Sequence, residues 1–363
     1  MSESTIADIA KFLDTEDMLG HLRNFVKDLL ASFERLGDAG PAWVPGLRER
    51  KWKGLLCLGM GGSAAGGAAL SALSDHQGVL PVLTHSDYGI PSWWQPEHLV
   101  IATSYSGNTE ETLDATRKII AAGGCVIAIC SGGELAGLSE LHDDVHLVLV
   151  PSGQPPRSAF GHLFGAQLSL AWSLGLMRKP NALDLSMMLE NLQKHLDASD
   201  FIANPENDLA HLAAAMVERT IAVIGCTELA PMVNRFTCQI NENSARFARG
   251  ASLPEMNHNE IIAWGGVGDD CDPKAAEQAL VLLTWGGMNA RVKQRFDWFS
   301  NHLSTEHGWR IICEGRTLLE AMLYSCITMD WLSCALALLH GKDPTAIGPI
   351  TSLKEHLSSI EAN

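Results

Sequence analysis

Hydrophobic residues in the first part of the chain occur in short continuous runs separated by segments of helical spacing. The runs have the length of buried strands and lie at 54–58, 80–84, 99–103, 125–130 and 145–150. Between them the helical spacing is clearest over 109–122, where Gly123 and Gly124 provide a stop. Continuous apolar strands that alternate with helices are typical of a parallel sheet covered on both faces. We therefore predict an α/β fold.

The second part of the chain repeats this pattern in a degenerate form. Strands are predicted at 220–225, 279–285 and 309–313, with helices at 232–242 and 290–303. We therefore predict two domains, 51–178 and 208–363, each a parallel sheet flanked by helices on both faces; the second includes a C-terminal helix. Amphipathic helices within 1–50 are predicted to pack on the core, and the more polar 179–207 is predicted to be a helical linker.

Two apolar segments are nearly long enough, or long enough, to span a membrane. The segment 158–177 contains no Asp, Glu, Lys or Arg, but His162 and several glycines interrupt it. The segment 318–339 is interrupted by Glu320 and Asp330. We predict that both are core helices and that the protein has no membrane partner.

The overall charge restricts the partners of the chain. Its formal net charge is −16 over 363 residues, which argues against nucleic acid or an anionic membrane but permits a small anionic ligand. The nine cysteines form no C-x-x-C pair, and residues 1–11 do not resemble a signal peptide, so we expect reduced thiols and a cytoplasmic location. No His, Cys or Asp cluster has the spacing of metal ligands, and we expect no metal.

The loop from Ser104 to Thr109 is the first candidate for ligand binding. It lies between a predicted strand and a predicted helix, where free backbone N–H groups and the helix dipole face an anion. Ser104, Ser106 and Thr109 add hydroxyl donors, and Gly107 allows close approach of the backbone. The loop has no lysine and is not a nucleotide P-loop. We predict a phosphate site, with an ordinary N-capped helix as the alternative.

A glycine-rich loop, Gly59 to Gly67, follows the first predicted strand. It fits a dinucleotide-binding pattern poorly, because Ala64 stands where the third glycine is required. The second strand ends at Thr84 and leads into His85-Ser86 with no acidic residue, which also disfavours NAD. In a parallel sheet this loop and the serine-rich loop would meet at the carboxyl edge of the strands.

Four charged side chains in later stretches are further candidates. Arg157 follows two prolines and precedes an apolar helix, and Glu242 lies late in a nearly neutral helix. His258 stands among amides, and Lys354 lies in a short helix near the end of the chain. Taken singly, each is typical of an ordinary surface or solvated residue.

Together these stretches resemble the bifunctional phosphoglucose/phosphomannose isomerases of the sugar isomerase (SIS) superfamily. The motifs occur in family order over about residues 50–355: Gly59-Met60-Gly61-Gly62-Ser63, Ser104 to Thr112, Pro156-Arg157, Asn241-Glu242-Asn243, Asn257-His258-Asn259-Glu260 and Leu353-Lys354. The serine-rich loop marks the superfamily, and the other stretches narrow it to this group. The chain looks longer than compact members in its N-terminal helices and around 294–308.

The resemblance implies two SIS-type domains and a sugar 6-phosphate as substrate, without metal or cofactor. It implies that the 6-phosphate is held by Ser104, Ser106 and Thr109. It also implies that the sugar is touched by the loop residues Gly61, Gly62 and Ser63.

The same resemblance implies the catalytic roles. Glu242 would move a proton between C1 and C2, and Arg157 would stabilise the enediolate. His258, donated by the neighbouring subunit of a homodimer, would assist ring opening together with Lys354. These types suit the chemistry, because one carboxylate can serve both carbons, arginine stays charged, and histidine titrates near neutrality.

The sequence therefore predicts an aldose–ketose isomerase that interconverts glucose 6-phosphate, and mannose 6-phosphate, with fructose 6-phosphate. Three alternatives stay open. They are a non-catalytic phosphosugar-binding SIS protein, an SIS enzyme for another sugar phosphate, and two α/β domains whose loops only cap helices. The ratio of glucose to mannose activity does not follow from the sequence, because these epimers differ in the orientation of one hydroxyl.

Overall fold

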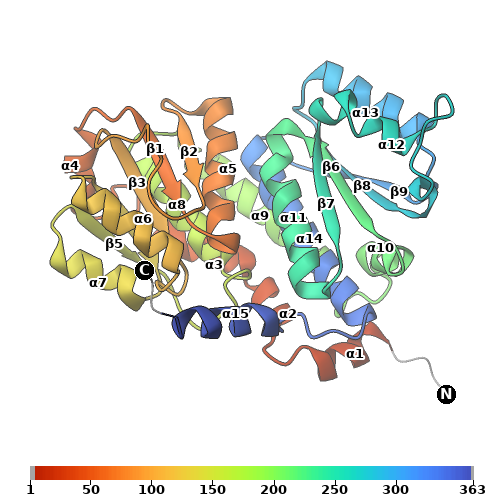
Figure 1. Cartoon of the computed structure of the whole chain (residues 1–363), viewed down its shortest axis with the longest axis horizontal. Coiled ribbons are helices and arrows are strands. Elements are labelled where there is room, and N and C mark those ends of the chain that lie inside the picture. The colour runs from red at the N-terminus through yellow and green to blue at the C-terminus, as the bar shows by residue number, and fades with distance from the viewer. Residues whose placement is uncertain (1–4, 361–363) are drawn as a thin grey trace.

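The chain folds around two separate parallel sheets (Figure 1). The computed structural model describes residues 5–360. The first sheet has the order β2-β1-β3-β4-β5, and all neighbouring strands are parallel. Its strands are β1 Gly54–Leu58, β2 Val82–His85, β3 His98–Thr103, β4 Val126–Cys130 and β5 Val145–Leu149. The central strands are buried on both faces, as their continuous apolar sequences predict.

The second sheet has the order β7-β6-β8-β9 and is also parallel throughout. Its strands are β6 Ile221–Cys226, β7 Ala248–Leu253, β8 Ala279–Trp285 and β9 Gly308–Cys313. The sequence analysis missed β7, whose residues Ala-Arg-Gly-Ala-Ser-Leu contain no apolar run. An edge strand that is half exposed does not need one, because only one neighbour, β6, pairs with it. The predicted α/β class with two parallel sheets is confirmed.

Helices surround both sheets and join them. In the first half they are α1 Ile6–Leu13, α2 Met18–Arg23, α3 Phe25–Leu36, α4 Val44–Arg48, α5 Gly61–Gln77, α6 Glu110–Ala121, α7 Gly133–Leu141, α8 Phe160–Ser173 and α9 Ala182–Ser199. In the second half they are α10 Asp208–Met216, α11 Ala230–Ser244, α12 Ile261–Trp264, α13 Ala290–His302, α14 Leu318–Leu339 and α15 Gly348–Ser358. Three short 3₁₀ turns are η1 Thr227–Leu229, η2 Glu255–His258 and η3 Ala275–Glu277.

The predicted amphipathic helices of the N-terminal segment are divided into α1, α2, α3 and α4. The break between α1 and α2 is made by Asp14 and Asp17, whose carboxylates accept hydrogen bonds from the first N–H groups of α2. Aspartate satisfies such unpaired donors at a helix start, so the apolar periodicity continues through the break and conceals it. Helix α3 then packs lengthwise on α8.

The two long apolar segments are core helices, as predicted. Every residue of α8 is buried. Helix α14 has the length and hydropathy of a membrane span, but 89% of its apolar window is buried inside the protein. It packs against α11, α10 and α9. A helix that is apolar all round needs such neighbours on every side.

Candidate active site

The glycine-rich and serine-rich loops meet at the carboxyl edge of the first sheet. Strands β1 and β3 are neighbours, so the loops that follow them lie side by side. The Ser63 hydroxyl accepts a hydrogen bond from the backbone N–H of Tyr105 at 3.2 Å. A side chain at Gly62 would lie 3.4 Å from the Cα of Arg157, so glycine lets this loop approach the Arg157 loop as well.

The serine-rich loop is folded by its own hydroxyls. The Oγ atoms of Ser104 and Thr109 are 2.8 Å apart, and Ser104 Oγ also accepts from the Gly107 N–H at 3.1 Å. Gly107 has a φ of 71°, and a Cβ there would collide with the carbonyl oxygen of Gly132. Only glycine fits this position.

The start of α6 is left without a side-chain cap. Thr109 is the N-cap residue, but its side chain makes no capping hydrogen bond to the helix, and Ser106 is exposed. The alternative prediction is that these hydroxyls only cap a helix. None of them caps α6, because Ser104 and Ser106 accept from N–H groups within the loop itself. The arrangement leaves helix N–H groups and a hydroxyl free for an anion.

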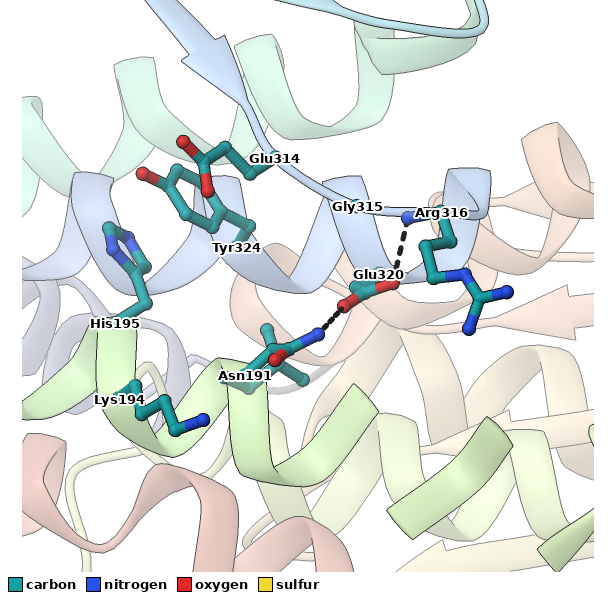
Figure 2. A pocket seen from close by; sticks show the side chains of 9 residues that line it. Asn191, Lys194, His195, Glu314, Gly315, Arg316, Glu320 and Tyr324 are labelled. Carbon is teal, nitrogen blue, oxygen red and sulfur yellow. Dashed lines mark hydrogen bonds between the residues drawn. The ribbon is translucent and has the colours of Figure 1, made fainter. Parts of the chain in front are cut away.

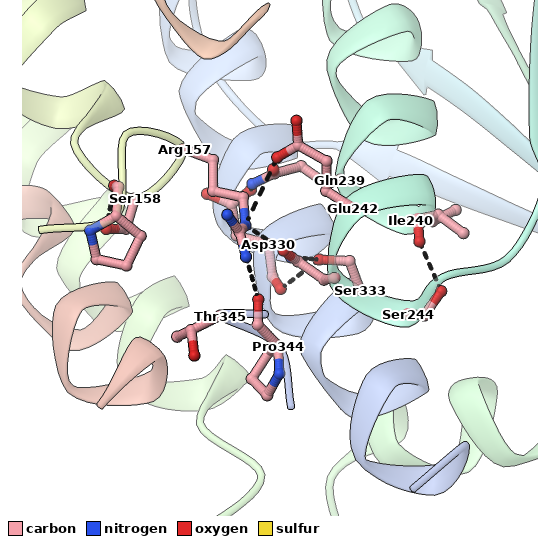
Figure 3. A network of polar contacts seen from close by, with 12 residues as sticks. Arg157, Ser158, Gln239, Ile240, Glu242, Ser244, Asp330, Ser333, Pro344 and Thr345 are labelled. Carbon is pink, nitrogen blue, oxygen red and sulfur yellow. Dashed lines mark hydrogen bonds and ion pairs between the residues drawn. The ribbon is translucent and has the colours of Figure 1, made fainter. Parts of the chain in front are cut away.

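Arg157 reaches from the first half of the chain to α11 in the second half (Figure 3). Its side chain is 5% exposed, and its Nε lies 3.6 Å from the Glu242 carboxylate, which is 32% exposed. Nε donates to Asn243 Oδ1 at 2.6 Å, and the guanidinium also donates to the carbonyl of Pro344. A buried cation thus faces a carboxylate that remains accessible from solvent.

A second buried arginine supports the first. Arg235 on α11 forms an ion pair with Asp330 on α14, with Nη2 and Oδ2 3.0 Å apart. The same nitrogen donates to the backbone carbonyl of Arg157 at 3.2 Å. Gln239 completes the bonding of Asp330 at 2.8 Å. The pair fixes the backbone of Arg157, and its two charges neutralise each other in a buried position.

His258 lies at the opposite end of the second sheet from Glu242. Helix α11 runs back along β6 and β7 and ends near their amino ends, whereas η2, which carries His258, follows the carboxyl end of β7 (Figure 1). The six residues of β7 span about 20 Å at about 3.3 Å per residue. Within a single subunit, His258 therefore does not reach Glu242.

Lys354 is not brought to the site by any side-chain contact. It lies on α15, where no residue is buried, and the side chain makes no ion pair or hydrogen bond with other residues in the range 5–360. The segment before α15 does pass the site, because Pro344 accepts from Arg157. The structure thus gathers both loops, Arg157 and Glu242, but not His258 or Lys354.

The sequence analysis missed the supporting residues. Arg235 and Asp330 are opposite charges on α11 and α14 that are both buried, so they signal a buried pair once the two helices are known to pack. Asp330 was noticed only as an interruption of an apolar segment. No sequence pattern indicates that Arg235 donates to the Arg157 backbone, because the two are joined by tertiary folding alone.

A separate cavity of about 550 Å³ lies beside the loop that follows β9 (Figure 2). His195 on α9 stacks on Tyr324 on α14 with ring centroids 3.5 Å apart, and its Nε2 lies 2.7 Å from Thr328 Oγ1. Glu320 in its wall accepts from Asn191 at 3.0 Å. None of the predicted site residues lines this cavity. Burial lowers the pKa of His195 to about 4 and raises that of Tyr324 to about 12.

His195 is expected to make the protein less stable in mild acid. The unfolded chain takes up a proton near pH 6.5, but the folded chain does so only near the lowered pKa of about 4. The free energy of unfolding therefore falls as the pH drops through this window, by roughly 1 to 2 kcal/mol between pH 7 and pH 5. The free energy of unfolding is measured by urea unfolding at both pH values. Its drop from pH 7 to pH 5 should be smaller in His195→Gln than in wild type by about that amount. His356→Gln, on exposed α15, is the control; equal pH slopes in all three proteins would contradict the expectation.

Comparisons with known proteins show which family the chain belongs to. The profile of the bacterial phospho-glucose isomerase C-terminal SIS domain matches residues 205–357. A protein from Aquifex aeolicus, named bifunctional phosphoglucose/phosphomannose isomerase, is 31% identical over 84% of this chain and 91% of its own. One of the same name from Caldicellulosiruptor bescii is 32% identical over 85% and 90%.

A likeness to a solved structure supports the fold of the chain but not its function. The C-terminal domain of glucosamine-fructose-6-phosphate aminotransferase from Francisella tularensis has a TM-score of 0.72 at 12% identity, covering 90% of this chain and 97% of that one. Two parallel sheets with a hydroxyl-rich loop at the edge of the first define a two-domain SIS protein. Within that class, the chain belongs to the bifunctional phosphoglucose/phosphomannose isomerase family, which confirms the predicted resemblance.

Proposed function

We propose that this protein interconverts glucose 6-phosphate and fructose 6-phosphate, and mannose 6-phosphate and fructose 6-phosphate, through a cis-enediol(ate). The observation that carries the proposal is the Arg157–Glu242 pair, 3.6 Å apart, with Arg157 against the glycine-rich loop, which is itself bonded to the serine-rich loop. An aldose–ketose isomerase needs a carboxylate that can exchange a proton with two adjacent carbons. It also needs a fixed cation for the charge that develops on the enediolate oxygens.

The loops supply the anchor that the reaction requires. Ser104, Ser106 and Thr109, with the free N–H groups at the start of α6, would hold the 6-phosphate. The Gly61-Gly62-Ser63 turn would contact the sugar. A phosphate bound far from C1 and C2 fixes where those carbons lie, and that binding energy lowers the barrier to proton transfer.

Proton transfer through Glu242 is the central step of the proposal. The carboxylate removes the proton from C2 of the open-chain aldose and returns it to C1. The O2 hydroxyl loses its proton and O1 gains one, so that the carbonyl moves from C1 to C2. Arg157 stays charged throughout and faces the oxygens that carry the developing negative charge. A second carboxylate is not needed, because the same oxygen serves both carbons on one face of the enediol.

A coupled assay tests the proposal directly. Glucose 6-phosphate and mannose 6-phosphate are supplied separately, and formation of fructose 6-phosphate is followed with a chelator present throughout. Turnover of either sugar, with solvent deuterium entering at the transferred position, is the expected result. Binding of fructose 6-phosphate without proton exchange would favour a non-catalytic phosphosugar-binding protein. Turnover only of amino-sugar or heptose phosphates would assign another SIS reaction.

The proposed assembly is a cytoplasmic homodimer in which His258 of one subunit completes the site of the other. Two features support it. His258 is exposed about 20 Å along β7 from the level of Glu242, and α15 lies on the surface with none of its residues buried. His258 and Lys354 would then assist opening of the sugar ring, with histidine as proton donor and acceptor near neutral pH.

Mixed dimers test whether the site is shared. Glu242→Gln and His258→Ala subunits are each expected to be nearly inactive with ring-form substrate. If the two residues come from different subunits, a mixed dimer has one intact site, and random mixing restores about a quarter of wild-type activity. Separately assembled subunits, mixed without exchange, are the control. Failure of exchanged mixtures to regain activity would place both residues in one subunit's site or remove His258 from the mechanism.

A further inference from the structure

The N-terminal helices are tied to the candidate site through one buried carboxylate. Helix α3 packs on α8 at very short range, because Gly161 and Gly165 of α8 face it. A Cβ at Gly161 would lie 2.8 Å from the carbonyl oxygen of Phe25, and one at Gly165 would lie 2.8 Å from the Cβ of Ser32. This close approach brings Asp28, on the buried face of α3, against α8.

Asp28 makes two polar contacts inside this interface. Its Oδ2 accepts from the side-chain amide of Gln154 at 3.0 Å, and its Oδ1 lies 3.2 Å from Nε2 of His162. Burial raises the pKa of Asp28 and lowers that of His162. A carboxyl group held in such a place must be retained by its hydrogen bonds, since desolvation alone disfavours it.

Gln154 connects Asp28 to the serine-rich loop. The backbone N–H of Gln154 donates to the hydroxyl of Tyr105 at 3.0 Å, and Tyr105 lies between Ser104 and Ser106. Tyr105 is itself 6% exposed. Its own backbone N–H donates to Ser63, and its carbonyl accepts from the backbone N–H of Ser131 at 2.8 Å. Tyr105 thus bonds the serine-rich loop to the glycine-rich loop, to the loop that follows β4 and to the loop that leads to Arg157.

Gln154 also lies three residues before Arg157. The prolines at 155 and 156 restrict the backbone between them, so a shift of Gln154 is transmitted to Arg157. We propose that Asp28 is a positioning residue, which holds Gln154 and thereby sets the Arg157 loop and the serine-rich loop at a fixed separation. This inference rests on the proposed isomerase function and assigns the N-terminal helices a part in it.

The chemical reason for such a strut is the distance between the two ends of the substrate. The phosphate is to be held by one loop while the charge on C1 and C2 is met by Arg157 on another. A displacement of about 1 Å between anchor and reacting group is enough to cost a large factor in rate. Asp28 touches neither substrate nor Glu242 in this arrangement, so it acts only through Gln154.

Asp28→Ala tests the proposal. We expect kcat to fall about tenfold and KM for the sugar phosphate to rise, because both loops lose their common support. Asp28→Asn should restore kcat to within about twofold of wild type, since its amide can pair with the Gln154 amide in either orientation. Both variants are assayed after their unfolding transitions confirm that they are folded at the assay temperature.

Ser32→Ala is the matched control. Ser32 lies one turn further along α3 and donates to the backbone carbonyls of Asp28 at 3.0 Å and His162 at 3.1 Å, but it makes no hydrogen bond to Gln154. The Ser32→Ala protein should be less stable than wild type, because it loses a hydrogen bond at the same interface, while its kcat and KM stay near wild type. If Asp28→Ala and Ser32→Ala lose stability to the same extent and show the same kinetics, Asp28 is only a packing residue and the proposal is overturned.

A readout without turnover separates this inference from the proposed function. Inorganic phosphate should raise the melting temperature of wild type and Ser32→Ala, and should raise that of Asp28→Ala less. If wild type isomerises none of the sugars but this difference in protection remains, the proposed function fails and the strut stands. If wild type isomerises and the protection and kinetics are equal in all variants, the strut fails and the function stands.

Discussion

Glu242→Gln is expected to lose at least a thousandfold in kcat for both aldose phosphates. A general base contributes about 10²- to 10⁴-fold, and here a single carboxylate serves as base and then as acid, so the loss falls at the upper part of that range. Glutamine has nearly the same shape, and the group it replaces is 32% exposed and faces Arg157 at 3.6 Å, so folding should be little affected. Exchange of the C2 proton with solvent should disappear together with turnover.

Substrate binding should survive this change, which distinguishes a lost base from a lost site. Protection against heating by fructose 6-phosphate should remain in Glu242→Gln, whereas Ser106→Ala should mainly raise KM. Glu228→Gln is the matched control, because Glu228 is a half-buried carboxylate in η1, just before the opposite end of α11. Turnover of Glu242→Gln within a few fold of wild type would remove Glu242 as the base.

The fold was predictable where burial imposes a simple pattern. Strands such as β1 and β4 are covered on both faces, so their sequences are apolar throughout and they were found within a residue or two. Edge strand β7 carries Arg249 and Gly250, because one side of it faces solvent, and no periodicity marked it. Likewise, the aspartates that divide α1 from α2 act through capping, which leaves the apolar spacing unchanged.

The candidate site was predictable only in part, for a related reason. Local chemistry marks a loop such as Ser104–Thr109, where hydroxyls, glycine and a helix start are adjacent in sequence. The contact between Arg157 and Glu242 joins residues far apart in the chain, and it came from resemblance to a family rather than from spacing. Supports such as Arg235 and Asp28 had neither signal, because a buried ion pair or strut is defined by which helices pack together.

Arg157→Ala is expected to lower kcat about 10²- to 10³-fold, the usual cost of removing a donor aimed at developing negative charge. The guanidinium is held from both sides by Asn243 and Pro344, so it is in place before substrate arrives and needs no rearrangement during the reaction. Arg157→Lys keeps the charge but cannot reproduce the fork that reaches both partners, and it should recover only part of the rate. Added guanidinium ion should partly restore Arg157→Ala.

Loss of stability is the competing explanation, because Arg157 is 5% exposed and its removal leaves Asn243 Oδ1 without this donor. Arg23→Ala provides the comparison. Arg23 pairs with Asp200 at 2.7 Å through a partly buried guanidinium, so its removal should also destabilise the protein, but it lies outside the candidate site. If Arg157→Ala and Arg23→Ala have equal free energies of unfolding but Arg157→Ala has the lower kcat, Arg157 takes part in the reaction. Arg157→Ala that turns over as fast as Arg23→Ala would leave the enediolate without its proposed cation, and the charge would have to be met by another group at this edge of the first sheet.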